Sequence, residues 1–283
     1  MGSCIDLHFS PQRITDQFKF IDFKINTRYL EVKISMAEGT AVKLEGKRVV
    51  VVGGSSGIGL EVAAEVMREG GDVTIVGRSA DKLSRAVAGF ARGAPCRAIP
   101  CDVSDESQVA QLYEKIGPFD HLVVTAAGDI VYKTFDEMTL DDVHKVVGAK
   151  LVGAFLLVKY GKPLMRSGAS IVLTSGINAF MPPGRTSIVS AVNGALIAYA
   201  RALAVELAPI RVNTVSPGWV DTPIWGSIAT DDVKASMFRD MAGRLPVGRI
   251  GEPKDIAAAV TLLLTNSYMT GTTLEVDGGR RLL

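Results

Sequence analysis

The chain has 283 residues, of which 47% are hydrophobic and 22% are charged, and its 31 Lys and Arg residues nearly balance 30 Asp and Glu residues. This length suits one α/β domain or two small ones and allows a large buried core. The formal net charge of +1 excludes the basic excess that is typical of proteins that bind nucleic acid or an anionic membrane. We therefore expect no nucleic-acid or membrane partner.

The number and spacing of the cysteines and the length of the apolar runs indicate the cellular compartment. The three cysteines, Cys4, Cys96 and Cys101, are too few for a disulfide framework and lack CxxC spacing, which favours free thiols in a reducing environment. No uninterrupted apolar run reaches the ~18 residues of a membrane-span candidate. Charged residues also interrupt the segment from Ile5 to Ser35, where a signal peptide would need an apolar stretch. The sequence therefore predicts a cytoplasmic protein.

The first 44 residues differ in texture from the rest of the chain. The stretch FKFIDFKIN (residues 18–26) alternates like an imperfect strand, and residues 29–34 are a second possible strand. Two interpretations stay open, an accessory N-terminal extension and an integral β-hairpin, and we favour the extension. We accordingly divide the chain into an extension over residues 1–44 and one domain over residues 45–283.

From Lys47 onward, short β-branched runs alternate with helical periods. Residues 49–52 are all valine, which is typical of a strand buried on both faces of a parallel sheet, and Ile58, Val62 and Val66 then recur on one face of a helix. Thr139 and Asp142 form a capping signal for a later, long helix. Further strands are predicted at residues 73–76, 97–101, 121–125, 171–174, 211–215 and 272–276. The pattern predicts a single Rossmann-type, doubly wound α/β sheet of seven mostly parallel strands with helices on both faces.

A glycine-rich segment, Gly53-Gly54-Ser55-Ser56-Gly57-Ile58-Gly59, follows the first predicted strand directly and enters a helix. The first glycine permits a tight turn, Gly57 lets the backbone approach a pyrophosphate, and Gly59 allows close contact between helix and sheet. The helix N-terminus presents unpaired N–H groups to the anion. An ordinary strand-to-helix turn is the alternative, but the strand before and the helix after favour a dinucleotide site.

The GxxxGxG spacing of this segment resembles the short-chain dehydrogenase/reductase family, and the resemblance covers nearly all of residues 45–280. Asp102-Val103, Arg211-Val212-Asn213, Ser216-Pro217-Gly218 and Asp277-Gly278-Gly279 match further segments of the family. In that family the first of these segments contacts adenine, and the positions of Val220 and Thr222 hold the nicotinamide carboxamide. The resemblance implies these cofactor contacts: Gly53, Ser55, Ser56, Gly57, Ile58, Gly59, Arg78, Ser79, Asp102, Val103, Ala126, Ala127, Gly128, Thr174, Pro217, Gly218, Val220 and Thr222.

The end of the second predicted strand indicates which dinucleotide binds. Enzymes that use NAD place an Asp or Glu about 20 residues past the glycines, to bind the ribose 2′-hydroxyl. Here that position reads Gly77-Arg78-Ser79 and contains no acid. An arginine can pair with a 2′-phosphate and stack on adenine, although a solvated arginine at a strand end is the alternative. We predict NADP(H) as the cofactor.

The catalytic residues of the family are all replaced. Typical members use a Tyr-x-x-x-Lys pair, a serine about thirteen residues earlier and an asparagine on the preceding helix. The alignment places Val189 at the tyrosine, Asn193 at the lysine, Gly176 at the serine, next to Ser175, and Lys150 at the asparagine. Valine cannot transfer a proton, so the family's usual ketone reduction is not predicted.

Two kinds of hydride acceptor stay open, because the nicotinamide carries the redox chemistry. An iminium is already cationic and needs no proton donor, and atypical relatives in alkaloid-type pathways are thought to use such substrates. Alternatively, Lys150 polarises a carbonyl with help from Ser175, Thr174 or Asn193. The structural alternatives are a snorkelled or salt-bridged lysine for Lys150 and a hydroxyl bonded to the backbone for Ser175. The candidate catalytic residues are thus Lys150, Ser175 and Asn193.

The leading hypothesis is an NADP(H)-dependent short-chain oxidoreductase with an atypical active site that reduces a carbonyl, imine or iminium. A non-redox protein that keeps the dinucleotide for sensing or structure, and an NADP-holding isomerase or cyclase, are the alternatives. His121 and His144 lack partners at metal or triad spacing, so we predict structural roles for both and no metal site. In the resembling family, residues 223–245 form a lid over the substrate, in which Trp225 is either a pocket wall or a packing residue.

We also expect a homo-oligomer, a tetramer or a dimer. The resemblance implies it, and two long predicted helices, around residues 140–160 and 190–207, carry apolar residues on more than one face. Those residues are Val146, Val147, Leu151, Leu156, Leu196, Ile197 and Leu203.

Overall fold

The computed structural model describes residues 43–91, 93–126, 128 and 131–283. The predicted N-terminal extension lies outside these residues apart from its last two positions, and so does Ala127. Leu44 is 1% exposed and belongs to the hydrophobic core, and its backbone N–H donates to the carbonyl oxygen of Glu69 at 3.0 Å. The packed domain therefore already includes Leu44.

Seven strands form one sheet, in which every neighbouring pair is parallel. The strand order is β3-β2-β1-β4-β5-β6-β7, so the direction of winding reverses between β1 and β4. The predicted doubly wound sheet is confirmed, and such a reversal opens a crevice beyond the carboxyl ends of the strands. The strands are β1 (Arg48–Val52), β2 (Asp72–Gly77), β3 (Cys96–Pro100), β4 (Phe119–Val124), β5 (Met165–Thr174), β6 (Arg211–Pro217) and β7 (Thr273–Val276).

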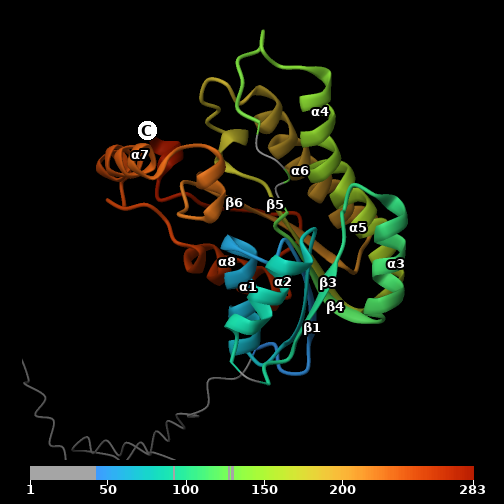
Figure 1. Cartoon of the computed structure of the whole chain (residues 1–283). Helices are drawn as coiled ribbons and strands as arrows, with labels where there is room; N and C mark the ends of the chain where they lie inside the picture. Colours follow the sequence, from blue (N-terminus) through green and yellow to red (C-terminus); the bar gives the residue numbers. More distant parts are fainter. Residues whose placement is uncertain (1–42, 92, 127, 129–130) are drawn as a thin grey trace, which may run out of the picture. The chain divides into compact units, whose positions relative to one another are not determined.

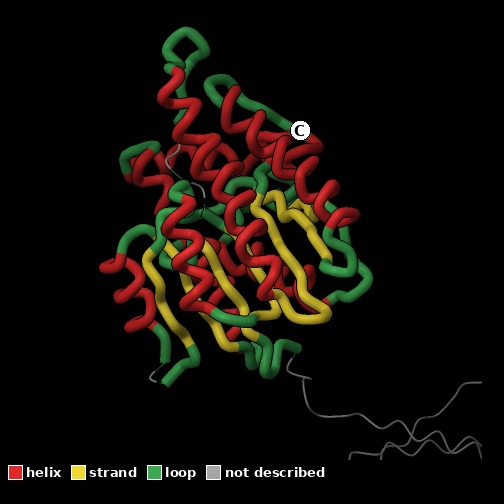
Figure 2. Tube along the Cα trace, turned by 90° about the vertical axis from the view of Figure 1, so that its right-hand side faces the viewer, coloured by secondary structure: helices red, strands yellow, loops and turns green. Residues whose placement is uncertain are grey.

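Helices cover both faces of the sheet, as Figures 1 and 2 show. Val49 and Val51 of β1 face one core with α1, α2 and α8, whereas Val50 and Val52 face the other core with α3, α5 and α6. The alternation follows from strand geometry, which points successive side chains to opposite faces. The helices are α1 (Gly57–Arg68), α2 (Ala80–Gly89), α3 (Glu106–Ile116), α4 (Leu140–Val147), α5 (Gly153–Gly161), α6 (Ser187–Glu206), α7 (Asp231–Arg244) and α8 (Pro253–Thr265).

The long helix predicted from Thr139 is divided in the structure. Its N-terminus is as expected, with a capping box in which the side chains of Thr139 and Asp142 each accept from the other's backbone N–H. After α4, however, the chain makes a π-helical turn of five residues, Gly148–Val152, before it continues as α5. A π turn inserts a residue into the helical ladder, and such turns are frequent at functional sites.

Helix α6 is long and apolar enough to cross a membrane by length and composition, with a mean hydropathy of 1.6 over its best window. Six of its residues are buried in the domain, including Leu196, Ala200 and Leu203, which pack into the core beside the sheet. A core helix of a globular domain has the same composition, so this feature is weak evidence for a membrane.

The amino ends of the central strands carry a buried polar cluster. Nδ1 of His121 lies 2.9 Å from Oγ of Ser170 on the neighbouring strand, and His121 is 4% exposed. The adjacent carboxylate of Asp120 accepts from the backbone N–H of Arg48 at 2.9 Å and pairs with Arg166 at 3.3 Å. Burial lowers the pKa of His121 to about 4. The predicted structural role of His121 agrees with this position, remote from the carboxyl ends of the strands.

We predict that His121 makes the fold less stable in mild acid. Its folded pKa of about 4 lies below the ordinary value of 6.5, so the unfolded chain takes up the proton first as the pH falls. The stabilisation is complete above pH 6.5 and is lost progressively towards pH 4. Between pH 7 and pH 5, the parent should lose ~2 kcal/mol more free energy of unfolding than His121→Gln, as measured by urea denaturation. Equal losses in the two proteins would contradict the assignment.

Candidate active site

A large cleft lies beyond the carboxyl ends of the strands, where the winding reverses. It encloses about 1220 Å³ and is lined by loops that follow β1, β2, β3, β4, β5 and β6. Pockets for one drug-sized ligand usually have volumes of ~300–1,000 Å³. The cleft therefore has room for a dinucleotide and a second molecule.

The glycine-rich turn packs as the sequence predicts. Gly53 has a φ of +85° and Gly57 a φ of +56°, a region that favours glycine. A Cβ on Gly59 would lie 2.3 Å from the carbonyl oxygen of Gly53, and a Cβ on Gly53 would lie 2.6 Å from Oγ1 of Thr125. Any side chain at these positions would push α1 away from the sheet. Ser56 precedes α1 without capping it through its side chain, and Ser56, Ile58 and Gly59 line the cleft, so the helix N-terminus lies at the cleft.

The structure brings most of the predicted cofactor contacts together along this cleft. Gly57 does not line the cleft itself, and Ala127 lies outside the described residues. The predicted residues that line it are Gly53, Ser55, Ser56, Ile58, Gly59, Arg78, Ser79, Asp102, Val103, Ala126, Gly128, Thr174, Pro217, Gly218, Val220 and Thr222.

A second cation accompanies Arg78 at the end of β2. Lys82, in the first turn of α2, lines the same part of the cleft. Oγ of Ser79 accepts from the backbone N–H of Lys82 at 3.3 Å, so Ser79 is the N-cap of α2 as well as a cleft residue. Lys82 was not among the predicted cofactor contacts, although its place three residues after Ser79, in the first turn of the predicted helix, could have indicated a second cation near Arg78.

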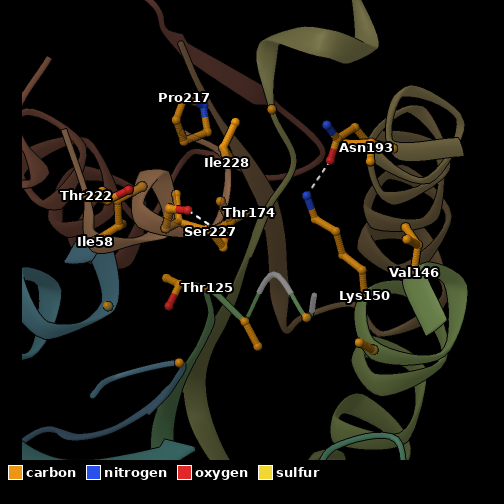
Figure 3. A pocket seen from close by; sticks show the side chains of 18 of the residues that line it. Ile58, Thr125, Val146, Lys150, Thr174, Asn193, Pro217, Thr222, Ser227 and Ile228 are labelled. Carbon is orange, nitrogen blue, oxygen red and sulfur yellow. Dashed lines mark hydrogen bonds between the residues drawn. The ribbon is translucent and has the colours of Figure 1, made fainter. Parts of the chain in front are cut away.

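The three candidate catalytic residues form one hydrogen-bonded cluster on one wall of the cleft, and Figure 3 shows Lys150 and Asn193 pointing toward each other. Nζ of Lys150, on the π turn, donates to Oδ1 of Asn193 on α6 and to the carbonyl oxygen of Ser175 at 3.3 Å. Oγ of Ser175 donates in turn to the backbone carbonyl of Asn193 at 2.9 Å. Figure 3 shows Ile58, Thr125 and Thr222 across the cleft from this cluster. Val189, one helical turn before Asn193, also lines the cleft.

The surroundings of Lys150 are neutral. Its two hydrogen-bond partners are carbonyl oxygens, and no carboxylate lies within ion-pair distance of its ammonium among the residues that the structure describes. Burial lowers the pKa of Lys150 to about 8. Among the residues that the structure describes, this lysine therefore makes no salt bridge, and its ammonium lies beside the cleft with a lowered pKa.

Ser175 matches its structural alternative. It is 4% exposed, and its hydroxyl is used to tie the end of β5 to a carbonyl of α6. Its hydroxyl therefore supports the cluster of Lys150, Ser175 and Asn193.

An unpaired hydroxyl lies where the nicotinamide end of a dinucleotide is expected. Oγ1 of Thr174, at the end of β5, is buried and has no hydrogen-bond partner among the described residues. Leaving a buried hydroxyl unpaired costs about 1–3 kcal/mol, which a ligand with a hydrogen-bonding group would relieve. Together with the glycine turn and the two cations, this hydroxyl fits a phosphorylated dinucleotide.

The far end of the cleft has an apolar and aromatic wall. The predicted lid contains a 3₁₀ turn (Pro223–Ser227) and the helix α7, which the sequence did not reveal. Trp225 lines the cleft, its ring centroid lies 4.9 Å from that of Trp219 at an interplanar angle of 34°, and its Nε1 donates to the carbonyl of Val220 at 2.9 Å. It is therefore both a pocket wall and a packing residue. Other lining residues that the sequence analysis missed are Tyr132, Ile177, Ile224, Ile228 and Met237.

No group of His, Cys, Asp or Glu side chains that could hold a metal ion is present within the described part of the chain. His144 is an exposed residue of α4 at the edge of the cleft.

The fold and the glycine turn define a dinucleotide-binding protein of the Rossmann class. A family model described as enoyl-(acyl carrier protein) reductase matches residues 52–281. The chain is 37% identical to the short-chain dehydrogenase/reductase ucsE of Acremonium sp, with 86% of this chain and 98% of that protein aligned. The chain belongs to the short-chain dehydrogenase/reductase family of oxidoreductases, which confirms the resemblance seen in its sequence.

Two further relatives are informative. The NADP-dependent (R)-specific alcohol dehydrogenase of Lentilactobacillus kefiri is 33% identical, with 84% of this chain and 97% of that protein aligned. The solved structure of the MalC reductase/Diels-Alderase from Malbranchea aurantiaca is similar with a TM-score of 0.80 at 29% identity, and the match covers 86% of this chain and 99% of that one.

We predict that Arg78 determines the choice between NADPH and NADH. One charge-assisted contact to a phosphate contributes ~1.5–3 kcal/mol, which corresponds to roughly tenfold to hundredfold in affinity. Fluorescence titration should show NADPH binding more tightly by about this factor, and Arg78→Ala should abolish most of the preference. Arg85→Ala is the matched control, because Arg85 is an exposed residue of α2 outside the cleft lining. Equal affinities in the parent would refute the prediction.

Proposed function

We propose that this protein is an NADP(H)-dependent reductase in which Lys150, in place of the family's tyrosine, polarises and protonates a substrate carbonyl. The single observation that carries this proposal is the ammonium of Lys150, held in the wall of the cleft by two neutral oxygens. NADP dependence and an alcohol or carbonyl substrate are also supported by the printed name of the Lentilactobacillus kefiri relative.

The residues of this chain provide a place for each part of the cofactor. The turn from Gly53 to Gly59 and the N-terminus of α1 would bind the pyrophosphate. Arg78 and Lys82 would bind the 2′-phosphate, and Thr174 would donate to the nicotinamide end. When bound, the nicotinamide supplies the hydride.

Lys150 would supply the proton that the reduction also needs. As the carbonyl carbon gains a hydride, its oxygen develops negative charge, and Val189 can neither stabilise that charge nor donate a proton. Nζ of Lys150 can donate an N–H to the oxygen and transfer that proton, which yields the alcohol and a neutral amine. Solvent then returns a proton to the amine. A pKa of about 8 suits this cycle near neutral pH, because the donor is mostly protonated but releases its proton more readily than an ordinary lysine.

Two other chemistries would make Lys150 dispensable. An iminium is already cationic, and a nearby ammonium would repel it. A pericyclic cyclisation transfers no proton, and this second candidate function is supported by the similarity to the MalC reductase/Diels-Alderase. Either chemistry would depend on the shape and aromatic wall of the cleft, including Trp219 and Trp225.

We predict that Lys150→Met binds NADPH almost as well as the parent but turns over a ketone ~10²–10³-fold more slowly, the usual effect of removing one group that stabilises developing charge. The readout is the loss of NADPH absorbance with a panel of ketones and cyclic imines. Lys145→Met is the matched control, because Lys145 lines the same cleft from α4 and pairs with Asp141 at 2.6 Å.

Each contrary result has a distinct meaning. Unchanged ketone turnover in a folded Lys150→Met protein would exclude the carbonyl-polarising role. Turnover of cyclic imines alone would favour an iminium acceptor. Tight binding of NADPH without oxidation by any substrate would favour the cyclase or the non-redox interpretation.

We further propose that the protein is a homo-oligomer, but most of the apolar helix residues that led to this expectation are not available for an interface. Five of the residues on which it relied, namely Val146, Leu156, Leu196, Ile197 and Leu203, are buried within the protomer and cannot form an interface. The large apolar side chains that do remain exposed on the two predicted helices are Leu140 at 69%, Val152 at 41%, Phe155 at 47% and Val205 at 80%. Light scattering at micromolar concentration should give a mass of two or four chains, and a monomer would refute the proposal.

A further inference from the structure

Lys150 and Asn193 reach each other from opposite elements of the cleft wall. Lys150 comes from the π turn after α4, and Asn193 comes from α6. We infer that Asn193 is a positioning residue that fixes the ammonium of Lys150 at the cleft and keeps it able to release its proton. This inference rests on the proposed function, in which Lys150 is the proton donor.

The amide of Asn193 is itself held in place. Asn193 is 3% exposed, and its backbone carbonyl accepts from Oγ of Ser175 at 2.9 Å. Its Nδ2 faces Gly176, where a Cβ would lie 2.9 Å from that nitrogen. A side chain at position 176 would therefore collide with the amide. Gly176 leaves the space that the amide occupies, and the amide directs its Oδ1 to Nζ of Lys150.

The choice of an amide explains the state of the lysine. A carboxylate at this position would raise the pKa of Lys150 and hold its proton, because an opposite charge within ~4–6 Å favours the charged form. An amide oxygen supplies a directional acceptor without a full charge, so the effect of burial dominates. Asn193 thus gives the ammonium a fixed place without neutralising it.

The pKa of Lys150 is lowered by burial and not by a neighbouring charge. Apart from Arg78, Lys82, Cys101 and Asp102 after β2 and β3, the ionisable side chains that line the described cleft besides Lys150 are Tyr132, His144, Lys145 and Arg185. The strand end at Ser175 contributes a carbonyl oxygen, and α6 has no ionisable side chain from residue 187 to residue 198. Burial is the cause of the shifted pKa of Lys150, which leaves Asn193 as the side chain that sets the position of the ammonium.

The test changes the charge of residue 193 while nearly preserving its shape. Lysine methylene signals followed by NMR against pH report the pKa of Lys150 directly, and the spectrum of Lys150→Met assigns them. Asn193→Asp should raise that pKa by at least ~1 unit, whereas Asn193→Leu should lower it, because one acceptor of the ammonium is lost. The alkaline limb of the pH profile of ketone reduction should move in the same directions.

Asn178→Asp is the matched control. Asn178 also lines the cleft, so the substitution adds the same charge to the same cavity without the contact to Lys150. Its effect on the pKa of Lys150 should be clearly smaller than that of Asn193→Asp. Because Asn193→Leu shifts the pKa in the opposite direction, the inference can be tested even if the buried aspartate prevents folding.

The positioning role of Asn193 and the proton-donor role of Lys150 are contradicted by different results. An unchanged pKa of Lys150 in Asn193→Asp and in Asn193→Leu would overturn the positioning role. A shifted pKa with an unshifted pH profile would instead show that Lys150 is not the proton donor, which would overturn the proposed function and the kinetic role of Asn193 with it.

Discussion

Burial of a parallel sheet on both faces is the constraint on which the rest of the structure depends. Because both faces are covered, β1 is a run of valines whose side chains alternate between two cores. Because all strands run the same way, every strand-to-helix loop lies at one edge of the sheet. Residues as far apart in sequence as Gly53, Arg78, Lys150 and Thr222 therefore line one cleft.

Close packing at that edge limits which residue types the chain can have there. The helix α1 approaches β1 so closely that the position of Gly59 has room for no side chain. The same closeness brings the N-terminus of α1 to the cleft, where its N–H groups can bind an anion. A substitution at Gly59 would disturb the fold and the nucleotide site together, since one contact serves both.

The sequence predicted the fold and the nucleotide half of the site because their signals are local. A valine run, a glycine turn and the Thr139–Asp142 capping box each occupy a few adjacent residues. The π turn at Gly148–Val152 was missed, since its residues read like any other stretch of helix. The helix α7 was missed because it buries only Met241 and so lacks an apolar face. The contact between Lys150 and Asn193 joins residues 43 positions apart, and only the fold brings them together.

The candidate catalytic residues differ from the usual family residues at several positions at once, and these differences fit one another. Lysine and asparagine exchange places between α6 and the helix that faces it, so an ammonium and an amide are both kept. The serine position becomes Gly176, whose missing side chain gives the amide of Asn193 its space. The phenol and the serine hydroxyl are lost, because Val189 is apolar and Gly176 has no side chain. Burying an ammonium without a counter-ion costs stability, and the lowered pKa of Lys150 is the sign of that cost. Since the hydrogen bonds to Asn193 and Ser175 only partly offset it, stability alone does not account for a lysine at this place, which is why we propose a chemical role for it.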